Sequence, residues 1–338
     1  MRIKLFITLL ILTASSACAQ DWIKVQGLEG LWRFNIGDNP EWKSPSYNDS
    51  KWELVKVPSS WENEGFHGYD GYGWYRKSFK VSSSYNNLYL SMGYIDDVDQ
   101  VFLNGHLIGA SGLFPPNYET AYDAKRNYPI PEEYLKHNEE NIIAVRVYDA
   151  QLEGGIMSGS IGIYTHGLNL TINLSGQWKF RQGDDLAWRD KDYPDKDWKE
   201  LIVPEFWENQ GYKTYDGFAW YRKNFYLNGK TAEESLVLVM GKIDDIDEVY
   251  LNGRLIGSSG DMGDRSYLGD TWQKTRGYFI PRELLIPNGW NVIAVRVYDG
   301  YLGGGIYQGP VGLAVQKEYK SYWNERRKKK NFFEKIFE

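Results

Sequence analysis

Two stretches of this chain repeat one another at the length of a whole domain. The matching phrases are VPSSWENEGFHGYDGYGWYRKSF and VPEFWENQGYKTYDGFAWYRKNF, from Val57 and Val203, and GYIDDVDQVFLNGHLIG and GKIDDIDEVYLNGRLIG, from Gly93 and Gly241. The spacing between matching phrases stays between 146 and 150 residues along the chain. This spacing indicates that a complete domain was duplicated, because solenoid units are only roughly 20 to 50 residues long.

Each copy is predicted to be β structure almost throughout. In IIAVRVYD, Ile143, Val145 and Val147 alternate with other residues, which is the pattern of a strand with one aliphatic face. Asn104-Gly105 separates two apolar runs, the strongest local signal for a tight hairpin. Neither copy has the apolar spacing of a long amphipathic helix. The sequence therefore predicts an all-β fold with one two-sheet sandwich per copy.

The N-terminus has the order of a secretory signal peptide: basic residues, an apolar run too short to span a membrane, and small residues. We expect residues 1–19 to be removed, leaving a secreted or periplasmic protein. The alternative is a lipid anchor at Cys18, although Ser15 stands where a bacterial lipobox has an aliphatic residue. Cys18 is the single cysteine, so the mature fold has no disulfide.

The repeats also set the expected domain boundaries. The first domain covers residues 20–166 and the second residues 167–316, with a short connection between them. Residues 317–338 form a tail that combines a basic block with apolar residues at helix-like spacing. This tail is either a helix that docks on a membrane surface or a partner, or a short helix that folds back on the second domain or frays.

Composition narrows the classes of partner. The chain has 338 residues and a net charge of -6, which offers no broad basic surface and excludes nucleic acid as an expected partner. Aromatic residues make up 16% of the chain, with 14 Trp and 26 Tyr. They favour β structure and supply flat apolar faces of the kind that stack on sugar rings.

The order of short motifs resembles a known family. Each copy contains, in sequence, the motifs W.F, VP..W, YDG..WYR, IDD.D.V.LNG..IG, N.IAVRVYD and GGI..G. This series is similar to the sugar-binding jelly-roll domain of glycoside hydrolase family 2, the galactose-binding-like β-sandwich that precedes the catalytic barrel in β-galactosidases and β-glucuronidases. RNYPIP and RGYFIP, followed by AVRVYD, are also similar to the jelly-roll insert of sialate O-acetylesterases. The resemblance implies two tandem galactose-binding-like jelly-roll β-sandwiches.

The motifs of catalysis are missing from the sequence. There is no room beside the two copies for a (β/α) barrel, and neither a G-x-S-x-G elbow nor a Gly-Asp-Ser esterase block occurs. None of the four histidines recurs at the equivalent position of the other copy. We therefore expect an accessory part of such enzymes that stands alone.

An acidic cluster in each copy is a candidate metal site. Hard carboxylate oxygens in a cluster suit Ca²⁺, or they form a patch that binds sugar hydroxyls. The alternative is structural: these aspartates shape the turn before a strand and pair with arginines. The residues are Asp96, Asp97 and Asp99 in the first copy, and Asp244, Asp245 and Asp247 in the second.

Candidate ligand-binding residues lie in or beside Gly-rich and divergent loops. The tryptophans and the YDG motifs are either loop contacts for a sugar or parts of the core and its turns, and the loop aromatics either stack on a sugar or fold back over the sandwich. By the family resemblance, the acidic residue that ends RVYD can touch the sugar. The candidates are Trp61, Tyr69, Asp70, Tyr118, Tyr122, Arg126 and Asp149 in the first copy, and Trp207, Tyr215, Asp216, Tyr267, Trp272, Arg276 and Asp299 in the second.

These features favour a secreted, non-catalytic carbohydrate-binding protein that holds an oligo- or polysaccharide for partner enzymes of glycan degradation. One alternative is an accessory part or subunit of a glycoside hydrolase or sialate O-acetylesterase system. Another is a structural or protein-interaction module. Membrane contact would come only through lipidation of Cys18 or through the basic tail.

Overall fold

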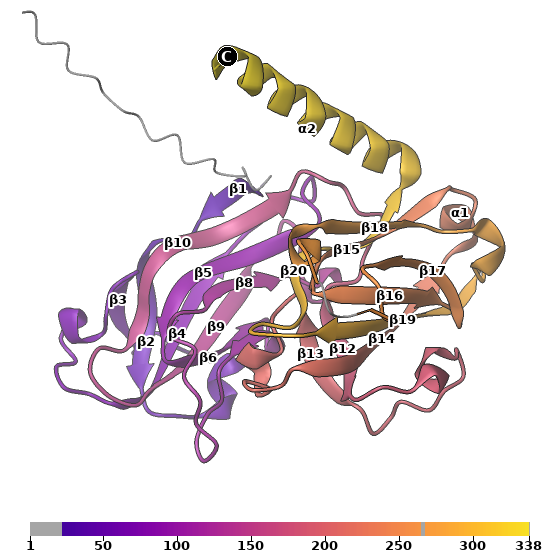
Figure 1. Ribbon diagram of the computed structural model, residues 1–338. Coiled ribbons are helices and arrows are strands. Elements are labelled where there is room, and N and C mark those ends of the chain that lie inside the picture. Colours follow the sequence, from indigo (N-terminus) through magenta and orange to yellow (C-terminus); the bar gives the residue numbers. More distant parts are fainter. Residues whose placement is uncertain (1–21, 265–267, 338) are drawn as a thin grey trace, which may run out of the picture.

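The computed structural model describes residues 22–264 and 268–337, with side chains up to residue 328. Over these residues the chain is almost entirely β, with 20 strands, short 3₁₀ helices and two α-helices. Figure 1 shows two β units beside one another, with the C-terminal helix projecting from the second. The predicted all-β class is confirmed, and the predicted signal peptide lies outside the described residues.

The first repeat contains ten strands: β1 (Trp22–Gly27), β2 (Gly30–Ile36), β3 (Glu53–Val57), β4 (Gly71–Phe79), β5 (Leu88–Asp96), β6 (Val98–Leu103), β7 (His106–Ser111), β8 (Lys125–Pro129), β9 (Asn141–Asp149) and β10 (Gly155–His166). They form a six-stranded sheet of order β3-β2-β4-β9-β6-β7 and a four-stranded sheet of order β1-β10-β5-β8. All the pairs are antiparallel.

The second repeat also contains ten strands: β11 (Ile172–Asn173), β12 (Gly176–Gln182), β13 (Lys199–Val203), β14 (Gly217–Leu227), β15 (Leu236–Asp244), β16 (Ile246–Leu251), β17 (Arg254–Ser259), β18 (Thr275–Phe279), β19 (Gly289–Asp299) and β20 (Gly305–Val315). Its sheets have the orders β13-β12-β14-β19-β16-β17 and β11-β20-β15-β18. Each strand of the first repeat therefore has its equivalent ten strands later, so the duplication seen in the sequence is also a duplication of topology.

Each repeat has its own hydrophobic core between its two sheets. In the first, Trp32 and Phe34 from β2 pack with Leu90 and Met92 from β5, and all four side chains are fully buried. The Trp32 indole N–H donates to the Leu28 carbonyl at 2.8 Å, which satisfies its only polar atom. The second core is built the same way. The result is a sandwich-like unit in each repeat.

Local sequence signals and structure agree where the pattern was strong. The residues Ile143, Val145 and Val147 of β9 are fully buried, as their alternation predicted. Asn104 and Gly105 both have positive φ, 50° and 90°, as a two-residue hairpin between β6 and β7 requires.

The two repeats touch through loops and sheet ends. The Gly112 amide after β7 donates to the Asn209 carbonyl of η5 (Glu208–Gln210) at 2.8 Å. The Asn87 side-chain amide donates to the Leu170 carbonyl at 3.3 Å. Through the first of these contacts, the loop that follows β7 in the first repeat lies against the loop that follows β13 in the second.

The C-terminal tail is helical, α2 (Gln316–Phe337), and follows β20 directly, whereas α1 (Gly229–Ala232) is a single turn. Tyr319 and Tyr322 of α2 pack on an apolar patch of the second repeat. The patch consists of Leu168, Leu170, Val237, Val239 and Ala314. The start of the helix therefore folds back on the second repeat. No helix in the described residues is apolar enough over a sufficient length to cross a membrane.

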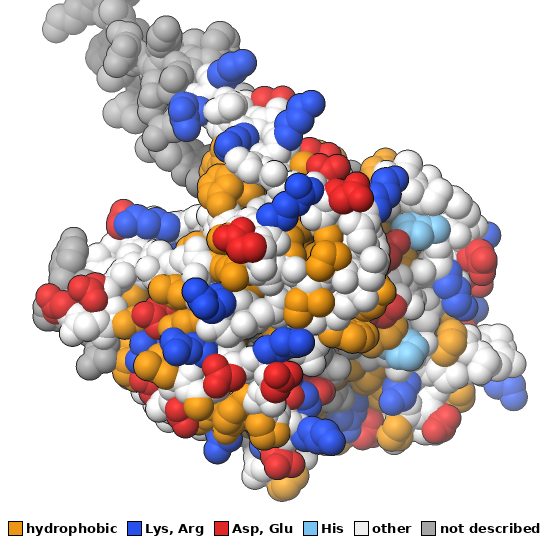
Figure 2. Space-filling model, turned by 90° about the vertical axis from the view of Figure 1, so that its right-hand side faces the viewer, with side chains coloured by type: hydrophobic (Ala, Val, Ile, Leu, Met, Phe, Trp, Pro, Cys, Tyr) orange, Lys and Arg blue, Asp and Glu red, His pale blue; other side chains and the backbone are white. Residues whose placement is uncertain are grey.

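Charge is mixed over the visible surface. On the face in Figure 2, Lys and Arg side chains are interspersed with Asp and Glu side chains, and no single sign dominates. This face has no basic stripe of the kind that follows a nucleic-acid backbone.

Candidate functional site

Three carboxylates meet at one end of each repeat. In the first repeat they are Asp96 at the end of β5, Asp97 directly after it, and Asp149 at the end of β9, and one oxygen from each lies within 4.8 Å of the others. We call this set the carboxylate triad. The second repeat has an equivalent triad, formed by Asp244, Asp245 and Asp299.

The fold brings the triad together because it joins the ends of two different sheets. β5 belongs to the four-stranded sheet and β9 to the six-stranded sheet. The register places Gly155 opposite Asp96 and Gly71 opposite Asp149, so the loop that follows β9 and the YDG loop both border the triad. Residues that are 52 positions apart in the sequence therefore share one site.

The pKa values of the three triad carboxyls differ because their surroundings differ. Burial, followed by contact with Asp97, raises the pKa of Asp96 to about 7. Burial acts on Asp97 too, but hydrogen bonds from Thr120 and Tyr118 outweigh it and lower the pKa of Asp97. Burial, and then the charges of Asp97, Asp96 and Asp70, raise the pKa of Asp149 to about 7. The triad thus combines a firmly ionised acid with two acids that gain or lose a proton near neutral pH.

Two carboxyls of the second triad, like two of the first, have raised pKa values. Burial, followed by contact with Asp245, raises the pKa of Asp244 to about 8. Burial, and then the charges of Asp245 and Asp216, raise the pKa of Asp299 to about 6. A shared arrangement in both copies indicates that the site is a feature of the domain.

Some buried oxygens beside the triads lack a hydrogen-bond partner. Asp149 and Asp299 are completely buried, and Oδ2 of each is unpaired. Oε1 is likewise unpaired in Glu62 and Glu208, while Oε2 of each accepts the backbone amide of Gly154 or Gly304, respectively. An unpaired buried oxygen is costly, so a water, cation or ligand atom is expected to bind there.

The sequence groups Asp99 with Asp96 and Asp97, whereas in the structure Asp99 pairs with an arginine, as the structural alternative expected. Asp99 is fully buried beneath the triad, where its Oδ1 accepts from Arg126 Nε at 2.8 Å and its Oδ2 accepts from the Tyr128 hydroxyl at 2.7 Å. Asp247 is held in the same way by Arg276 and Tyr278. Because both oxygens of each carboxylate are in use, Asp99 and Asp247 support the fold, and Asp149 and Asp299 take the third place in the triad.

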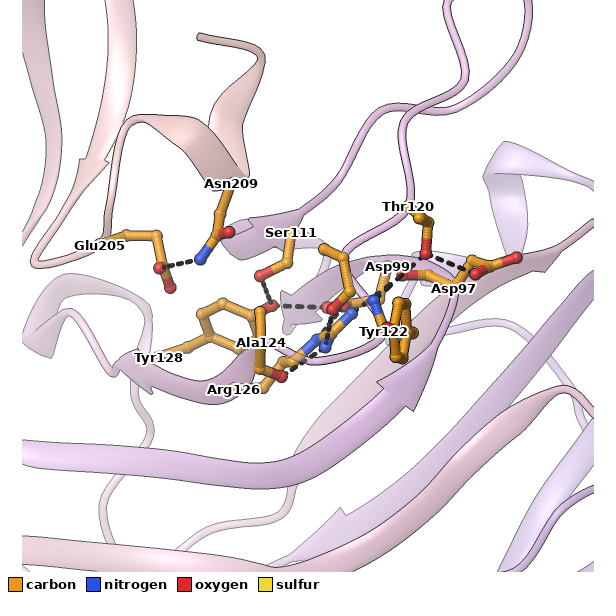
Figure 3. A network of polar contacts seen from close by, with 11 residues as sticks. Asp97, Asp99, Ser111, Thr120, Tyr122, Ala124, Arg126, Tyr128, Glu205 and Asn209 are labelled. Atoms are coloured by element: carbon orange, nitrogen blue, oxygen red, sulfur yellow. Dashed lines mark hydrogen bonds and ion pairs between the residues drawn. The ribbon is translucent and has the colours of Figure 1, made fainter. Parts of the chain in front are cut away.

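The two candidate arginines are structural for the same reason. Arg126 is completely buried and donates to Asp99 and to the carbonyls of Ala121, Ala124 and Asp97, as Figure 3 shows for part of this network. Arg276 makes the equivalent contacts. Neither guanidinium is exposed to a ligand at the surface. Arg126 holds the loop that carries Asp97, and Arg276 holds the loop that carries Asp245.

Trp61 and Trp207 are also core residues. Both rings are fully buried, and each indole N–H donates to the carbonyl of the YDG tyrosine, Tyr69 or Tyr215, at 3.1 and 3.2 Å respectively. Tyr69 in turn donates to the Tyr72 carbonyl at 2.9 Å. Trp61 and Trp207 therefore present no face to a sugar, and the two tyrosines fix a turn.

Other candidates stay at the surface. Asp70 and Asp216 are exposed and close enough to raise the pKa of Asp149 and Asp299. Tyr118 is 37% exposed and hydrogen-bonds to Asp97, so it lies at the rim of the first triad. Tyr122 and Trp272 are 58% and 43% exposed. Tyr267 lies outside the described residues.

The sequence did not point to two glutamates of the site. It did point to the triad aspartates, but as members of two separate candidate groups. Glu62 and Glu208 occupy the same position of the repeated WEN motif, and their recurrence in both copies was the available signal. The tertiary structure assembles Asp149 with the Asp96-Asp97 pair, because the ends of β9 and β5 converge.

Comparison with known protein families gives a match within the first repeat. Residues 37–153 match the family model described as the β-galactosidase second all-β domain. The chain is 28% identical over 155 residues to β-galactosidase BoGH2A of Bacteroides ovatus, a match that covers 39% of this chain and 16% of that protein. It is 31% identical over 149 residues to a putative β-glucuronidase of Formosa agariphila, covering 39% of this chain and 13% of that protein. The chain thus spans less than a fifth of these relatives.

Solved structures give matches over more of the chain. A β-glucuronidase from glycoside hydrolase family 2 matches 84% of this chain and 27% of its own, with 14% identity and a TM-score of 0.39. A calcium binding mutant of Bacteroides uniformis β-glucuronidase 2 matches 81% of this chain and 28% of its own, with 14% identity and a TM-score of 0.38. By the family model and the curated relatives, the segment that they match is similar to an accessory β domain of glycoside hydrolase family 2.

Proposed function

We propose that this protein is a secreted, non-catalytic carbohydrate-binding protein whose two galactose-binding-like jelly-roll domains hold an oligo- or polysaccharide for glycan-degrading enzymes. The observation that carries the proposal is the duplicated carboxylate triad, which lies among exposed loop residues in both repeats. The similarity of residues 37–153 to a β-galactosidase accessory domain supports the same class of ligand.

The chemistry of the triad suits sugar hydroxyls. Ionised carboxylates are strong acceptors for hydroxyl donors, and a protonated carboxyl such as Asp96 also donates. Tyr118 adds a partly exposed aromatic ring at the rim of the first triad. An apolar ring face beside a group of acceptors matches one C–H face of a pyranose and the hydroxyls around it.

A hard divalent cation fits the same residues, and we propose Ca²⁺ as the ion. The donor set consists of carboxylate oxygens, and the Oδ2 atoms of Asp149 and Asp299 are buried without a partner. Asp96, Asp97 and Asp149 would hold the ion in the first repeat, and Asp244, Asp245 and Asp299 in the second. A bound cation would supply a positive charge that attracts sugar hydroxyl oxygens.

A second candidate is an accessory role within a glycoside hydrolase or sialate O-acetylesterase system. The similarity to β-galactosidase and β-glucuronidase chains favours the hydrolase branch. The contact between Asp96 and Asp97 does not suit hydrolysis by the triad itself, because a glycosidase needs roughly 5 Å or more between its two carboxyl groups. Activity would come from another polypeptide or another part of a longer chain.

The decisive experiment is a glycan-array screen of the wild-type protein beside Asp149→Asn/Asp299→Asn, with and without a chelator. We expect binding to one glycan class, weakened at least about tenfold in the variant, because each change removes a charged acceptor with little change in shape. Glu29→Gln, which neutralises an exposed carboxylate paired with Lys24, is the matched control and should bind like wild type.

The outcomes separate the proposals. If the chelator abolishes glycan binding, the binding depends on a cation. If binding resists the chelator, the carboxylates recognise the glycan directly. A Tyr122→Ala/Trp272→Ala variant shows whether the loop aromatics contribute. Absence of binding to any glycan overturns the proposed function, and cleavage of chromogenic glycosides by the protein alone would overturn its non-catalytic character.

The proposed location is testable separately. Mass spectrometry of the mature protein should show an N-terminus at Gln20 if the signal peptide is cleaved as proposed. A lipid attached to Cys18 would instead establish the membrane-anchored alternative.

A further inference from the structure

A cavity of about 340 Å³ lies between the two repeats, apart from both triads. Trp22, Tyr89 and Asn127 line it from the first repeat, and Glu205, Phe206 and Tyr307 from the second. Its volume is in the range of small-molecule sites, which begin at roughly 300 Å³. Neither repeat alone contains it.

Six of the residues that line the cavity differ between the two copies. Glu205 and Phe206 replace the Ser59 and Ser60 of the first repeat, and Tyr307 replaces Met157. On the other wall, Trp22, Tyr89 and Asn127 stand where the second repeat has Leu168, Val237 and Gly277. At the surface that faces its partner, each copy therefore has aromatic and polar side chains that the other copy lacks at the equivalent positions.

In the second repeat, Glu205 replaces the hydrogen bond that a serine makes in the first repeat. In the first repeat, Ser60 Oγ accepts the side-chain amide of Asn63 at 2.8 Å. In the second, Phe206 replaces that serine, and Glu205 Oε1 instead accepts the side-chain amide of Asn209 at 2.7 Å and the Phe206 amide at 3.0 Å. The local turn is preserved, while one carboxyl group and one phenyl ring are added to the wall of the cavity.

The cavity combines aromatic surface with uncharged hydrogen-bonding groups. The Phe206 and Tyr307 rings stack at 4.6 Å, and Trp22 meets Tyr89 edge-on at the same distance. Asn127, Asn209 and Gln308 add amide groups, each able to donate and to accept. The two exposed charges in the lining, Asp123 and Lys125, have opposite signs.

The buried Glu205 completes the polar set. It is only 7% exposed, and burial raises its pKa to about 7, so the group donates as an acid as well as accepting near neutral pH. Figure 3 shows Glu205 reaching from the second repeat toward Tyr128 and Ser111 of the first. Its place between the repeats couples the cavity to the buried network that supports the first triad.

We propose that this inter-repeat cavity is a second carbohydrate site, which takes a neutral monosaccharide unit or disaccharide. Aromatic walls match the apolar faces of a pyranose, and the amides and the Glu205 carboxyl match its hydroxyls. The lining carries no excess of positive charge to hold a uronate or sulfate. No triad residue lines the cavity, so this site can bind a sugar even if the triads bind no glycan.

The test is a ligand-detected NMR titration of the full chain with lactose and cellobiose, with glucuronate as the charged comparison. It is run in wild type and in the Asp149→Asn/Asp299→Asn background, where only a site outside the triads remains. We expect a neutral disaccharide to bind to wild type and to the Asp149→Asn/Asp299→Asn background. Adding Glu205→Ser/Phe206→Ser to either protein should weaken this binding at least roughly tenfold, because a central aromatic contact and a carboxyl are lost.

The double variant recreates the pair found in the first repeat, where Ser60 holds the equivalent asparagine, so it should fold. Its thermal unfolding midpoint checks this. Tyr307→Met, which also restores the residue of the first repeat, should give a second loss of binding through another side chain of the same wall. Failure of both neutral disaccharides to bind in the triad background overturns the proposal. So does binding that is unchanged in both wall variants, or binding of glucuronate alone.

Discussion

At the scale of single residues, burial divides the repeated aspartates into two roles. Asp99 and Asp247 are completely enclosed and each is paired with an arginine, whereas Asp96 and Asp244 remain partly exposed at the triads. The motif IDD.D therefore contains both a structural acid and a functional candidate. The third aspartate of the motif is the one that pairs with a buried arginine.

The first residue-scale prediction concerns the buried ion pair. Asp99→Ala should lower the free energy of unfolding by about 3 to 5 kcal/mol, because it leaves the Arg126 charge buried and unpaired. The exposed Lys24–Glu29 pair is the matched control, and Glu29→Ala should change stability by less than about 1 kcal/mol. Denaturant unfolding followed by tryptophan fluorescence measures both. Equal effects of the two variants would contradict the structural role of Asp99.

The second residue-scale prediction concerns pH. The pKa of Glu205 rises from its ordinary 4.5 to about 7 on folding, mainly through burial. Between these values the folded chain keeps a proton that the unfolded chain has released, so the contribution of Glu205 to stability falls as pH rises through this window. Wild type should lose about 2 to 3 kcal/mol more free energy of unfolding between pH 5 and pH 8 than Glu205→Gln, because glutamine does not titrate. Parallel pH profiles for the two proteins would show that Glu205 does not titrate in this range.

At the scale of elements, equivalent faces of the two four-stranded sheets have different partners. In the second repeat the face carries Leu168, Val237 and Gly277 and is covered by the start of α2. In the first repeat the equivalent positions are Trp22, Tyr89 and Asn127, which line the cavity between the repeats. The two sheets have the same strand order, and different residues on one face accompany a different neighbour for each.

The prediction at this scale tests how α2 docks. A Cβ added at Gly277 would lie 2.1 Å from the Tyr319 hydroxyl, so Gly277→Ala should displace that ring from the sheet. Overpacking of this kind costs about 1 to 3 kcal/mol. Hydrogen exchange should become faster in the first turns of α2, while Asn127→Ala, at the equivalent position of the first repeat, should leave them unchanged. Unaltered exchange in Gly277→Ala would show that Tyr319 does not anchor the helix.

At the scale of the whole molecule, the contact between repeats depends on a short loop. Leu113 packs against Gly211, where an added Cβ would lie 3.3 Å from its methyl carbons, and the neighbouring Gly112 amide donates to the Asn209 carbonyl. These contacts lie in the loop that joins the first triad's network to the wall of the cavity. The relative position of the repeats is therefore tied to both candidate sites.

The whole-molecule prediction is that Leu113→Asp loosens the contact between the repeats. A charge placed against Gly211 loses apolar burial and has no partner there, so small-angle scattering should show a larger radius of gyration. The calorimetric transition should broaden or divide as the repeats unfold separately. Leu152→Asp, at a side chain that is 80% exposed, is the control and should leave both measurements unchanged. An unchanged radius in Leu113→Asp would show that other contacts hold the repeats.

The sequence by itself determined the duplication, the all-β class and the hairpin at Asn104-Gly105, because these depend on local periodicity and turn chemistry within a few residues. It also supplied most members of the candidate site as separate residues. Only the tertiary structure decided which of them act together. Asp149 joins Asp96 because strands of two different sheets converge, and Trp61 is lost as a ligand contact because its ring is enclosed. Burial and the convergence of distant strands are properties of the packed molecule, so no local pattern encodes them.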